Sequence, residues 1–322
     1  QNTLDMITDT ILIIGANGQL GSVLTKELQL IHGKSNIIAS DVYLNSNFDG
    51  TFELLDATDI KAIEKIVTKY SINQIYHLAA ILSAKGEEKP LRTWDMNMNM
   101  MLNVFEVARL SNVKKVFFPS SIAVFGDNAP LISTPQSAFL NPATVYGISK
   151  AAGENWAQYY FIKYGLDIRS LRYPGVVGYQ SMPGGGTTDY AVDIYHSAVK
   201  GESYSCFLDT ETKLPMIFMD DAIRATIELM KAPTENIKTR TSYNLDAMSF
   251  NPSEIFDEIK KLYPKFEIEY NPDFRQTIAD KWPKSIDDSE AQKDWGWKPR
   301  FNLKSMTSLM LKKLEEKYNT IK

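Results

Sequence analysis

The stretch ILIIGANGQLG at residues 11–21 constrains the possible folds more than any other part of this 322-residue chain. Its first four residues are apolar without interruption, which is typical of a short strand buried on both faces. Glycines follow at Gly15, Gly18 and Gly21, and leucines then recur every fourth residue, as on one face of a helix. Glycines at this spacing allow a tight turn and let the backbone approach a pyrophosphate, whose charge the N-terminus of a helix favours. The stretch therefore predicts a strand, a phosphate-binding turn and a helix.

Apolar runs typical of strands and helical patterns continue to alternate through the first half of the chain. We expect further strands at four places, which are residues 36–41, 51–56, 74–79 and 115–121. This alternation predicts an α/β fold of the Rossmann type, in which helices cover a doubly wound parallel sheet.

The second half of the chain is less regular. Within residues 215–232 we expect the end of a strand and then a helix begun by Asp220 or Asp221. Pro252 marks the first turn of a later helix, and residues 304–318 form an amphipathic final one.

The length of the chain allows one large α/β unit with an appended lobe. We expect a nucleotide-binding domain at residues 1–175, to which part of 214–246 returns. Residues 176–322 are expected to form a smaller, interwoven lobe that binds the substrate.

Composition excludes several classes of function. The formal net charge is −4 and the sequence contains no basic run, so nucleic acid is not an expected partner. No apolar run reaches the roughly 18 residues that a membrane span needs, so a membrane is not expected either. Residues 1–10 lack the basic start and apolar centre of a secretory signal. The single cysteine, Cys206, rules out an intrachain disulfide framework and a cysteine-rich metal site. A cytoplasmic location is expected, or a mitochondrial one if the source is eukaryotic.

An acidic residue stands where a dinucleotide site needs one. Asp41 ends the strand expected at 36–41, about 20 residues after Gly21, where its carboxylate would bond the ribose hydroxyls of the adenosine. The residues DVYLNS that begin at Asp41 contain no arginine or lysine to neutralise a 2′-phosphate. The pattern therefore favours NAD over NADP.

A tyrosine and a lysine four residues apart, Tyr146 and Lys150, share one face of a predicted helix. A tyrosine normally titrates near 10, and an adjacent ammonium favours the phenolate and lowers that pKa. A purely structural arrangement, in which the aliphatic part of a lysine packs along a buried aromatic ring, would give the same pattern. With a nucleotide site upstream, the pair is the leading candidate for proton transfer.

Seven motifs together resemble the extended short-chain dehydrogenase/reductase family over nearly the whole chain. They are GANGQLG, YHLAA at 76–80, NMNMMLNVFEVA at 97–108, PSSIAVFG at 119–126, YGISK at 146–150, LRYPGVVG at 171–178 and DWGWKPRF at 294–301. The resemblance implies that Ser121 is catalytic and holds the substrate oxygen beside Tyr146, and that Asn99 orients Lys150. It also implies that Asp56 contacts the adenine ring. The full set of cofactor-binding residues expected is Gly15, Asn17, Gly18, Gln19, Leu20, Gly21, Asp41, Leu55, Asp56, Leu78, Ala79, Ala80, Asn99, Tyr146, Lys150, Tyr173, Pro174 and Val176.

One departure from the family pattern concerns the substrate. Many members that act on sugar nucleotides carry an asparagine after R-Y-x, whereas this chain has Pro174 and Gly175 there. The departure weakens a sugar-nucleotide assignment and leaves the hydride chemistry untouched.

The loop PGGGTTDYAV at residues 183–192 can be interpreted in two ways. It is either a flexible surface loop before a helix N-cap or a loop that closes on something small and polar. This block, RYPG, LPMIFMDDAIRAT and DDSEAQKDWGWK resemble the branch of the family that oxidises threonine. That resemblance implies NAD-dependent oxidation of the L-threonine side-chain alcohol to 2-amino-3-ketobutyrate, with Tyr146 as the base, Lys150 lowering its pKa and Ser121 aligning the hydroxyl.

An amino-acid substrate brings a carboxylate and an ammonium that need partners once water is excluded. Backbone N–H groups of the glycine loop can meet the carboxylate, and the loop threonines can add hydroxyl groups. Asp189 either receives the ammonium or caps the following helix, and Trp282 either covers the substrate or belongs to the core. The substrate-binding residues expected are Ser83, Ser121, Tyr146, Gly184, Gly185, Gly186, Thr187, Thr188, Asp189 and Trp282.

Two rival functions remain at this point. A nucleotide-sugar 4-epimerase or dehydratase would need basic groups for a diphosphate, and the lobe offers Arg224, Arg240, Arg275 and Arg300. A non-catalytic module that senses NAD would not need Tyr146, Lys150 and Ser121 together.

Several other residues receive structural interpretations. His77 is interpreted as a packed histidine with its hydrogen bonds satisfied, and isolated His32 and His196 give no metal site. The methionines between Met96 and Met101 are interpreted as core or subunit packing. The family resemblance implies a homodimer formed through the helices of this region and of the Tyr-Lys pair.

Overall fold

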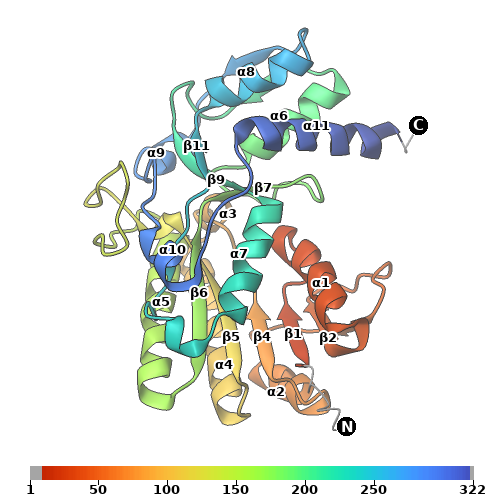
Figure 1. The fold of residues 1–322 in the computed structure, drawn as a ribbon, viewed down its shortest axis with the longest axis vertical. Coiled ribbons are helices and arrows are strands. Elements are labelled where there is room, and N and C mark those ends of the chain that lie inside the picture. The colour runs from red at the N-terminus through yellow and green to blue at the C-terminus, as the bar shows by residue number, and fades with distance from the viewer. Residues whose placement is uncertain (1–8, 320–322) are drawn as a thin grey trace.

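The central feature of the fold is a parallel sheet of seven strands (Figure 1). The computed structural model describes residues 9–319, so the prediction of no secretory signal rests mostly on residues outside the described part. Neighbouring strands follow the order β3, β2, β1, β4, β5, β6, β10. The strands are β1 (Ile11–Ile14), β2 (Ile37–Asp41), β3 (Thr51–Leu54), β4 (Gln74–His77), β5 (Lys115–Ser121), β6 (Asp167–Tyr173) and β10 (Tyr243–Asn244). This arrangement confirms the predicted doubly wound α/β fold.

Helices cover both faces of this sheet. One face packs against α1 (Gln19–His32), α7 (Met219–Lys231) and α10 (Ser289–Trp295). The other face packs against α2 (Ile60–Lys69), α4 (Pro90–Leu110) and α5 (Val145–Tyr164). The methionines Met98, Met100 and Met101 of α4 are buried in this second layer. Short 3-10 turns, η1 (Lys34–Asn36), η2 (Ile122–Val124) and η3 (Thr234–Asn236), complete the domain.

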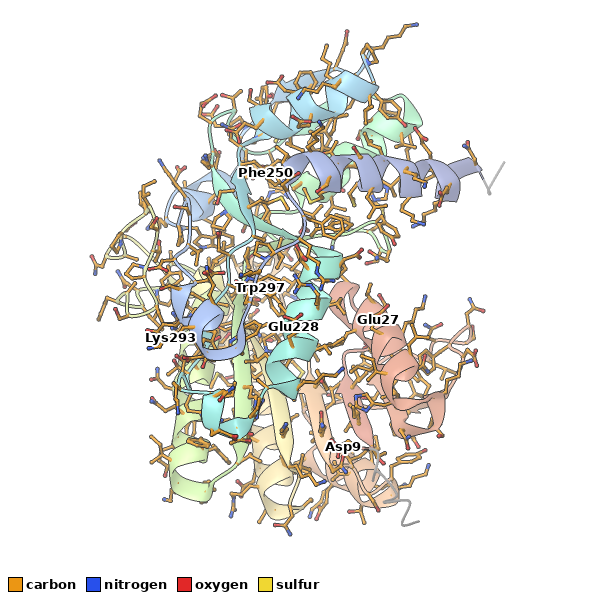
Figure 2. The ribbon with its side chains drawn as sticks, in the orientation of Figure 1. Asp9, Glu27, Glu228, Phe250, Lys293 and Trp297 are labelled. Carbon is orange, nitrogen blue, oxygen red and sulfur yellow. The ribbon has the colours of Figure 1, made fainter. Side chains whose placement is uncertain are left out.

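Most of the C-terminal half forms a lobe above the carboxyl ends of the sheet strands (Figure 1). Two small sheets lie in it, made of β7 (Gly175–Val177), β9 (Leu214–Phe218) and β11 (Met248–Phe250), and of β8 (Tyr204–Cys206) and β12 (Ile268–Tyr270). The lobe helices are α6 (Tyr190–Lys200), α8 (Pro252–Leu262), α9 (Arg275–Ala279) and α11 (Leu303–Asn319). Phe250 packs in the core of this lobe and Trp297 in that of the sheet domain, and both are fully buried (Figure 2).

Some predicted boundaries need correction. β3 and β4 end two residues earlier than predicted, because Leu55 and Leu78 already leave the sheet at its carboxyl edge. Helix α7 begins at Met219, and neither Asp220 nor Asp221 caps it. Asp221 lies in its first turn, where its carboxylate accepts the N–H groups of residues 300 and 301 at 2.9 Å each. The start of α8 is as predicted, with Pro252 in its first turn.

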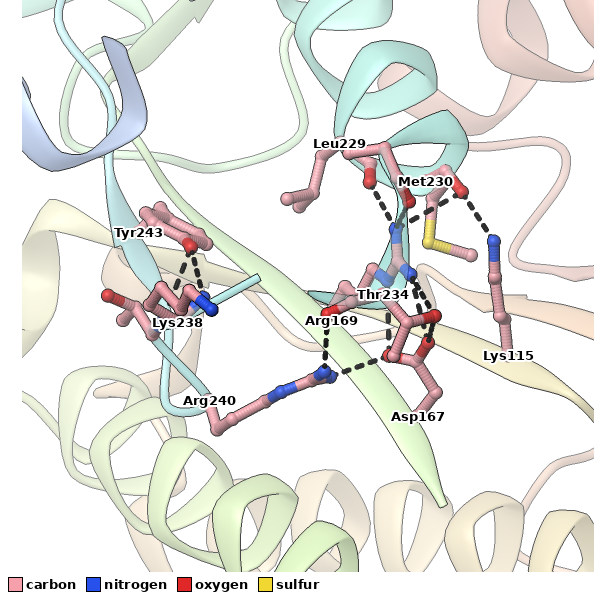
Figure 3. Close-up of polar contacts among 11 residues, drawn as sticks. Lys115, Asp167, Arg169, Leu229, Met230, Thr234, Lys238, Arg240 and Tyr243 are labelled. Atoms are coloured by element: carbon pink, nitrogen blue, oxygen red, sulfur yellow. Dashed lines mark hydrogen bonds and ion pairs between the residues drawn. The ribbon is translucent and has the colours of Figure 1, made fainter. Parts of the chain in front are cut away.

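A buried ionic cluster fixes the end of α7 to the sheet (Figure 3). Asp167 on β6 accepts hydrogen bonds from Arg169 at 2.9 Å and from Arg240 at 2.7 Å. Arg169 also donates to the carbonyls of Leu229 and Ala232 at 2.7 and 2.6 Å. The last turn of α7 exposes such carbonyls, and a guanidinium satisfies them. The chain therefore returns from the lobe to a fixed place on the sheet, beside the strand β10 that pairs with β6.

Two further observations concern membrane-spanning helices and metal ligands. Within residues 9–319, no helix is long and apolar enough to cross a membrane. In the same range, histidine, cysteine and acidic side chains do not gather in groups of three that could hold a metal ion.

Candidate active site

A cleft of about 560 Å³ lies between the carboxyl edge of the sheet and the lobe. Parallel α/β sheets bind ligands at this edge. Its lining includes most of the predicted site residues, which are Gly15, Asn17, Gly18, Gln19, Leu20, Gly21, Leu78, Ala80, Ser83, Ser121, Tyr146, Lys150, Tyr173, Pro174, Val176, Gly184, Gly186, Thr187, Thr188, Asp189 and Trp282. Six predicted residues do not line the cleft, and they are Asp41, Leu55, Asp56, Ala79, Asn99 and Gly185.

The glycine turn at one end of the cleft has no room for side chains. Gly15 has a φ of +89°, and a Cβ atom there would lie 2.8 Å from the nitrogen of Ala79. A Cβ on Gly21 would lie 2.1 Å from the carbonyl oxygen of Gly15. Helix α1 begins directly after this turn with no acidic residue in its first turn. This cradle therefore fits the pyrophosphate of a dinucleotide.

The acidic residue of the nucleotide site is held by the backbone of the same turn. Asp41 accepts the N–H of Asn17 at 2.9 Å on one carboxylate oxygen and that of Val42 at 2.7 Å on the other. Asp56 lies just past the neighbouring strand β3, where hydrogen bonds from Thr58 lower the pKa of its carboxyl. Neither carboxylate lines the cleft, and their contacts with the adenosine stay a prediction.

Tyr146, Ser121 and Lys150 meet in the middle of the cleft. The Tyr146 ring keeps part of its surface free, whereas its hydroxyl is enclosed by protein and hydrogen-bonded with Ser121. Burial raises the pKa of Tyr146 to about 12, and the bond to Ser121 offsets only part of that rise. Burial is thus the largest effect on the Tyr146 pKa in the chain by itself, and the lowering effect of Lys150 stays a prediction.

Lys150 is only 5% exposed. Its Nζ lies 4.7 Å from the ring centre of Phe118 and 5.5 Å from that of Tyr146. Burial lowers the pKa of Lys150 to about 7, although the charge of Glu154 acts in the opposite direction. Lys150 is therefore close to the catalytic tyrosine and needs nearby charge to remain protonated.

Asn99 does not line the cleft, so the structure does not support its predicted role, and Asn97 is the buried asparagine of this part of α4. Asn99 is exposed, whereas Asn97 is 7% exposed. The amide of Asn97 accepts the N–H of Ile81 at 2.9 Å and donates to the Ile81 carbonyl at 3.2 Å. Two residues along a helix are about 200° apart, so only one of the two can lie on the packed side of α4.

The glycine loop at the other end of the cleft is held by its own aspartate. Asp189 accepts the N–H groups of Gly185 at 2.8 Å and of Gly186 at 2.7 Å on one carboxylate oxygen. These two donors are therefore not free for a substrate carboxylate, which corrects the prediction made for them. Asp189 occupies the N-cap position of α6, but its side chain makes no cap hydrogen bond because it is turned to the glycine loop. Burial raises the pKa of Asp189 against the effect of the two donors.

Two hydroxyl groups join this loop to the sheet domain. Ser83, in the short helix α3 (Ser83–Gly86), lies 3.1 Å from the Thr187 hydroxyl. The Lys85 N–H also reaches the Gly185 carbonyl at 3.4 Å. The loop is consequently fastened at two points to α3, whose residues Ser83 and Lys85 line the cleft.

Trp282 fits both of its predicted roles. It is 4% exposed and belongs to the core of the lobe, and it also lines the cleft. Its indole nitrogen and the Ser181 hydroxyl are buried and have no hydrogen-bond partner within residues 9–319. The Trp282 indole N–H and the Ser181 hydroxyl are thus two unpaired polar groups of residues that line the cleft.

His77, at the end of β4, is not a base at neutral pH. It is 3% exposed, and burial, with a smaller effect of Lys150, lowers its pKa to about 3. Its Nδ1 finds no hydrogen-bond partner in the described part of the chain, so the prediction of a fully satisfied histidine is wrong.

Sequence reasoning missed several lining residues. They are Ile81, Leu82, Lys85, Pro119, Ser120, Ile122, Gly175, Ser181 and Met182. Ser120 could have been found from its place beside Ser121 at the end of a strand. Half of the others, Ile81, Leu82, Ser181 and Met182, lie on loops, where no periodic pattern marks the side that faces a ligand.

A glycine cradle on a Rossmann sheet together with a serine, a tyrosine and a lysine defines an extended short-chain dehydrogenase/reductase. The chain belongs to the NAD dependent epimerase/dehydratase family, whose model matches residues 11–245. NAD as the cofactor, expected from the glycine turn and Asp41, is confirmed with this membership.

Solved structures that resemble this chain narrow the comparison. An L-threonine dehydrogenase from Cupriavidus necator, in its holo form, is 51% identical, covers 95% of this chain and 99% of its own, and has a TM-score of 0.93. One from Clostridium difficile is 45% identical, covers 96% and 98%, and also has a TM-score of 0.93. A curated relative from Staphylococcus haemolyticus, an uncharacterised epimerase/dehydratase, is 45% identical over 96% of this chain and 98% of its own. The resemblance to the threonine-oxidising branch is thereby confirmed.

Proposed function

We propose that this protein oxidises the side-chain alcohol of L-threonine to 2-amino-3-ketobutyrate with NAD. The observation that carries the proposal is one cleft with the glycine cradle at one end and a short, hydroxyl-lined loop at the other. Ser121, Tyr146 and Lys150 lie between the two ends. L-Threonine dehydrogenases of 43–51% identity over nearly the whole chain support the same conclusion.

The chain's own residues supply the proton chemistry. The Ser121 hydroxyl, which already bonds Tyr146, would align the hydroxyl of the substrate beside the phenol. Tyr146, once deprotonated, takes the proton of that hydroxyl, and a protonated Lys150 stabilises the phenolate. Bound NAD supplies the hydride acceptor. Asn17, Asp41 and the glycines would hold its two nucleotide halves.

The charges of the cleft favour a small substrate over a sugar diphosphate. Within residues 9–319, the cleft lining contains no arginine and two lysines, Lys85 and Lys150. Arg224, Arg240 and Arg275 pair with acidic groups elsewhere, at 3.0, 2.7 and 2.5 Å. Three of the four arginines that a nucleotide-sugar epimerase could use are thus engaged outside the cleft, and Arg300 does not line it.

The experiment that tests the proposal is NADH formation by the purified protein with NAD and L-threonine, beside reactions with UDP-sugars and with no substrate. Threonine-dependent NADH, absent in both controls, is the expected result. Conversion of a UDP-sugar without threonine oxidation would replace the proposal by the epimerase function, and absence of any turnover with NAD bound would favour the sensing module.

We also propose a homodimer formed through α4 and α5. Apolar side chains remain exposed along α5 at Ile148, Trp156, Tyr159 and Ile162, with exposures of 47, 38, 43 and 75%. At 100° per residue these four positions fall within an arc of about 120°, which is one stripe of the helix. An exposed apolar stripe of this kind is typical of a surface that meets another subunit.

The domain division is proposed as expected from the sequence, with residues 1–175 as the cofactor domain and 176–322 as the substrate lobe. The pairing of β10 with β6, and the packing of α7 on the sheet, support the return of part of 214–246.

A further inference from the structure

A second ion pair is fully buried directly behind the cleft. Glu154 on α5 is 0% exposed and Arg172 on β6 is 3% exposed. Arg172 donates from Nε and from Nη2 to the two carboxylate oxygens of Glu154, each at 2.9 Å. Ser120 donates to the same carboxylate at 2.6 Å. Burying an ion costs on the order of several kcal/mol, so the Glu154–Arg172 pair needs an explanation beyond packing.

The Glu154–Arg172 ion pair is connected to the proton-transfer residues through α5 and β5. Tyr146, Lys150 and Glu154 are spaced four residues apart on α5, so they share one face of that helix. On β5, Ser121 bonds Tyr146, and its neighbour Ser120 bonds Glu154. Two consecutive strand residues therefore connect the reacting phenol and the buried carboxylate.

Arg172 is held as firmly as Glu154. Its Nη1 donates to the Gln136 carbonyl at 3.1 Å and to Asn244 Oδ1 at 3.0 Å. With its bidentate contact to Glu154, every nitrogen of the guanidinium has a partner. Arg172 cannot move toward the cleft without losing these bonds.

Lys150 itself has no ion pair or hydrogen bond from its ammonium within residues 9–319. The titratable groups that act on it are Tyr146 and Glu154 on its own helix and His77 on β4, with Arg172 on β6 behind Glu154. The strand β5 contributes only the Phe118 ring and two serines. His77 is neutral at the pH of any assay because burial lowers its pKa to about 3. Two cations and one carboxylate therefore leave the cluster with one positive charge.

We propose that Glu154 and Arg172 set the charge of the proton-transfer pair. Glu154 favours the protonated form of Lys150 in its buried position, and with Lys150 protonated Arg172 leaves the cluster with one positive charge that a phenolate at Tyr146 neutralises. Neither residue touches the reacting atoms, so both are positioning residues. The inference rests on the roles that the proposed function gives to Tyr146 and Lys150.

The test is a direct titration of the Lys150 ammonium by NMR of protein with isotope-labelled lysine, with the signal assigned by Lys150→Arg. Glu154→Gln removes the carboxylate charge and leaves Arg172 unpaired, so Lys150 should lose its proton at least one pH unit lower. Arg172→Met removes the competing cation, so Lys150 should lose its proton at higher pH. The pH at which kcat levels off should move in the same two directions. An unmoved Lys150, or shifts of the same sign in both variants, would overturn the inference.

A second set of variants guards against failure to fold. Glu154→Gln combined with Arg172→Met leaves no unpaired ion, and Lys150 should still titrate lower than in the parent, by less than in Glu154→Gln alone. Ser120→Ala is the matched control, since it removes a hydrogen bond from the same carboxylate without removing its charge and should shift the titration far less. An equal shift in Ser120→Ala would assign the effect to packing and contradict the inference.

This experiment separates the inference from the proposed function. The NMR titration needs no substrate, so it judges the charge cluster even if the parent protein gives no NADH with threonine. Threonine-dependent NADH with an unmoved Lys150 would leave the proposed function intact and remove the inference alone.

Discussion

The hydroxyl groups of Ser83 and Thr187 lie 3.1 Å apart although 104 residues separate them in the sequence. Both side chains are at least 96% buried, and both line the cleft. Thr187→Ala should raise the KM for threonine by about 5- to 10-fold, the effect of one lost hydrogen bond. The KM for NAD should change little. Steady-state kinetics on both substrates give the comparison, with exposed Thr277→Ala as the control; equal changes in both KM values would indicate a folding defect.

Tyr146→Phe separates catalysis from binding. Removal of the hydroxyl should lower kcat by about 10²- to 10⁴-fold, the usual contribution of a general base, and should leave the affinity for NAD unchanged. Fluorescence titration with NADH measures the binding and NADH formation measures the rate. Turnover near the parent rate would remove Tyr146 from the mechanism.

The rate of threonine oxidation should depend on pH through the same tyrosine. Because burial raises the pKa of Tyr146 to about 12, the fraction of phenolate grows about tenfold for each unit of pH below that value. The mechanism also needs the proton of Lys150, whose pKa is about 7. The kcat for oxidation should therefore rise with pH up to about 7 and level off above it, because further phenolate then forms only as Lys150 loses its proton. A kcat that does not change with pH below 7 would contradict the assignment.

Replacing Lys150 should lower activity and raise the free energy of unfolding. The folded protein holds the Lys150 proton only below about pH 7, whereas an unfolded chain holds it up to the ordinary lysine pKa. Between pH 7 and the ordinary lysine pKa, Lys150 takes up a proton when the protein unfolds, so its contribution makes the free energy of unfolding rise with pH. The destabilisation by buried Lys150 is therefore largest at and below pH 7. Lys150→Met should therefore raise the free energy of unfolding at pH 7 by about 2–4 kcal/mol, and less at higher pH. Denaturant titrations at several pH values measure the difference; a gain that grows with pH would have the wrong sign.

The choice of cofactor should depend on Asp41. Asp41→Ser removes a carboxylate that is held by two backbone N–H groups and that would repel a 2′-phosphate. The kcat/KM for NAD should fall by about 10-fold, and that for NADP should rise. The exposed Asp49→Ser is the matched control. Unchanged discrimination between the two cofactors would mean that another group reads the ribose.

The proposed dimer can be disrupted without entering the cleft. Ile162 is 75% exposed on α5, and Ile162→Lys places a charge within the apolar stripe. Light scattering after size-exclusion chromatography should then show a monomer where the parent shows a dimer. A parent that is already monomeric would refute the dimer directly.

The sequence predicted the parts of the site whose signal is local. The glycine turn, the strand ending at Ser121 and the Tyr146–Lys150 spacing each depend on a few adjacent residues, and all lie where they were expected. Asn97 and Asn99 could not be distinguished from sequence, because they stand on opposite faces of one helix and only the fold decides which face is buried.

Contacts between distant segments could not be predicted. The capture of two glycine N–H groups by Asp189 depends on the shape of a loop, and loops follow no periodic pattern. The raised pKa of Tyr146 was missed for a related reason. A lysine four residues away is visible in the sequence, whereas burial by the lobe is a property of the folded molecule.

The return of β10 to the edge of the sheet has a consequence for how such a protein can be cut or recombined. β10 is the partner that covers the outer edge of β6, and it is supplied by residues far beyond the lobe's first elements. A gene fragment that stops near residue 175 would leave β6 as a bare edge strand, which is a template for aggregation. The two halves therefore cannot be inherited or exchanged as separate modules, and a new substrate specificity has to arise by changes within the existing loops.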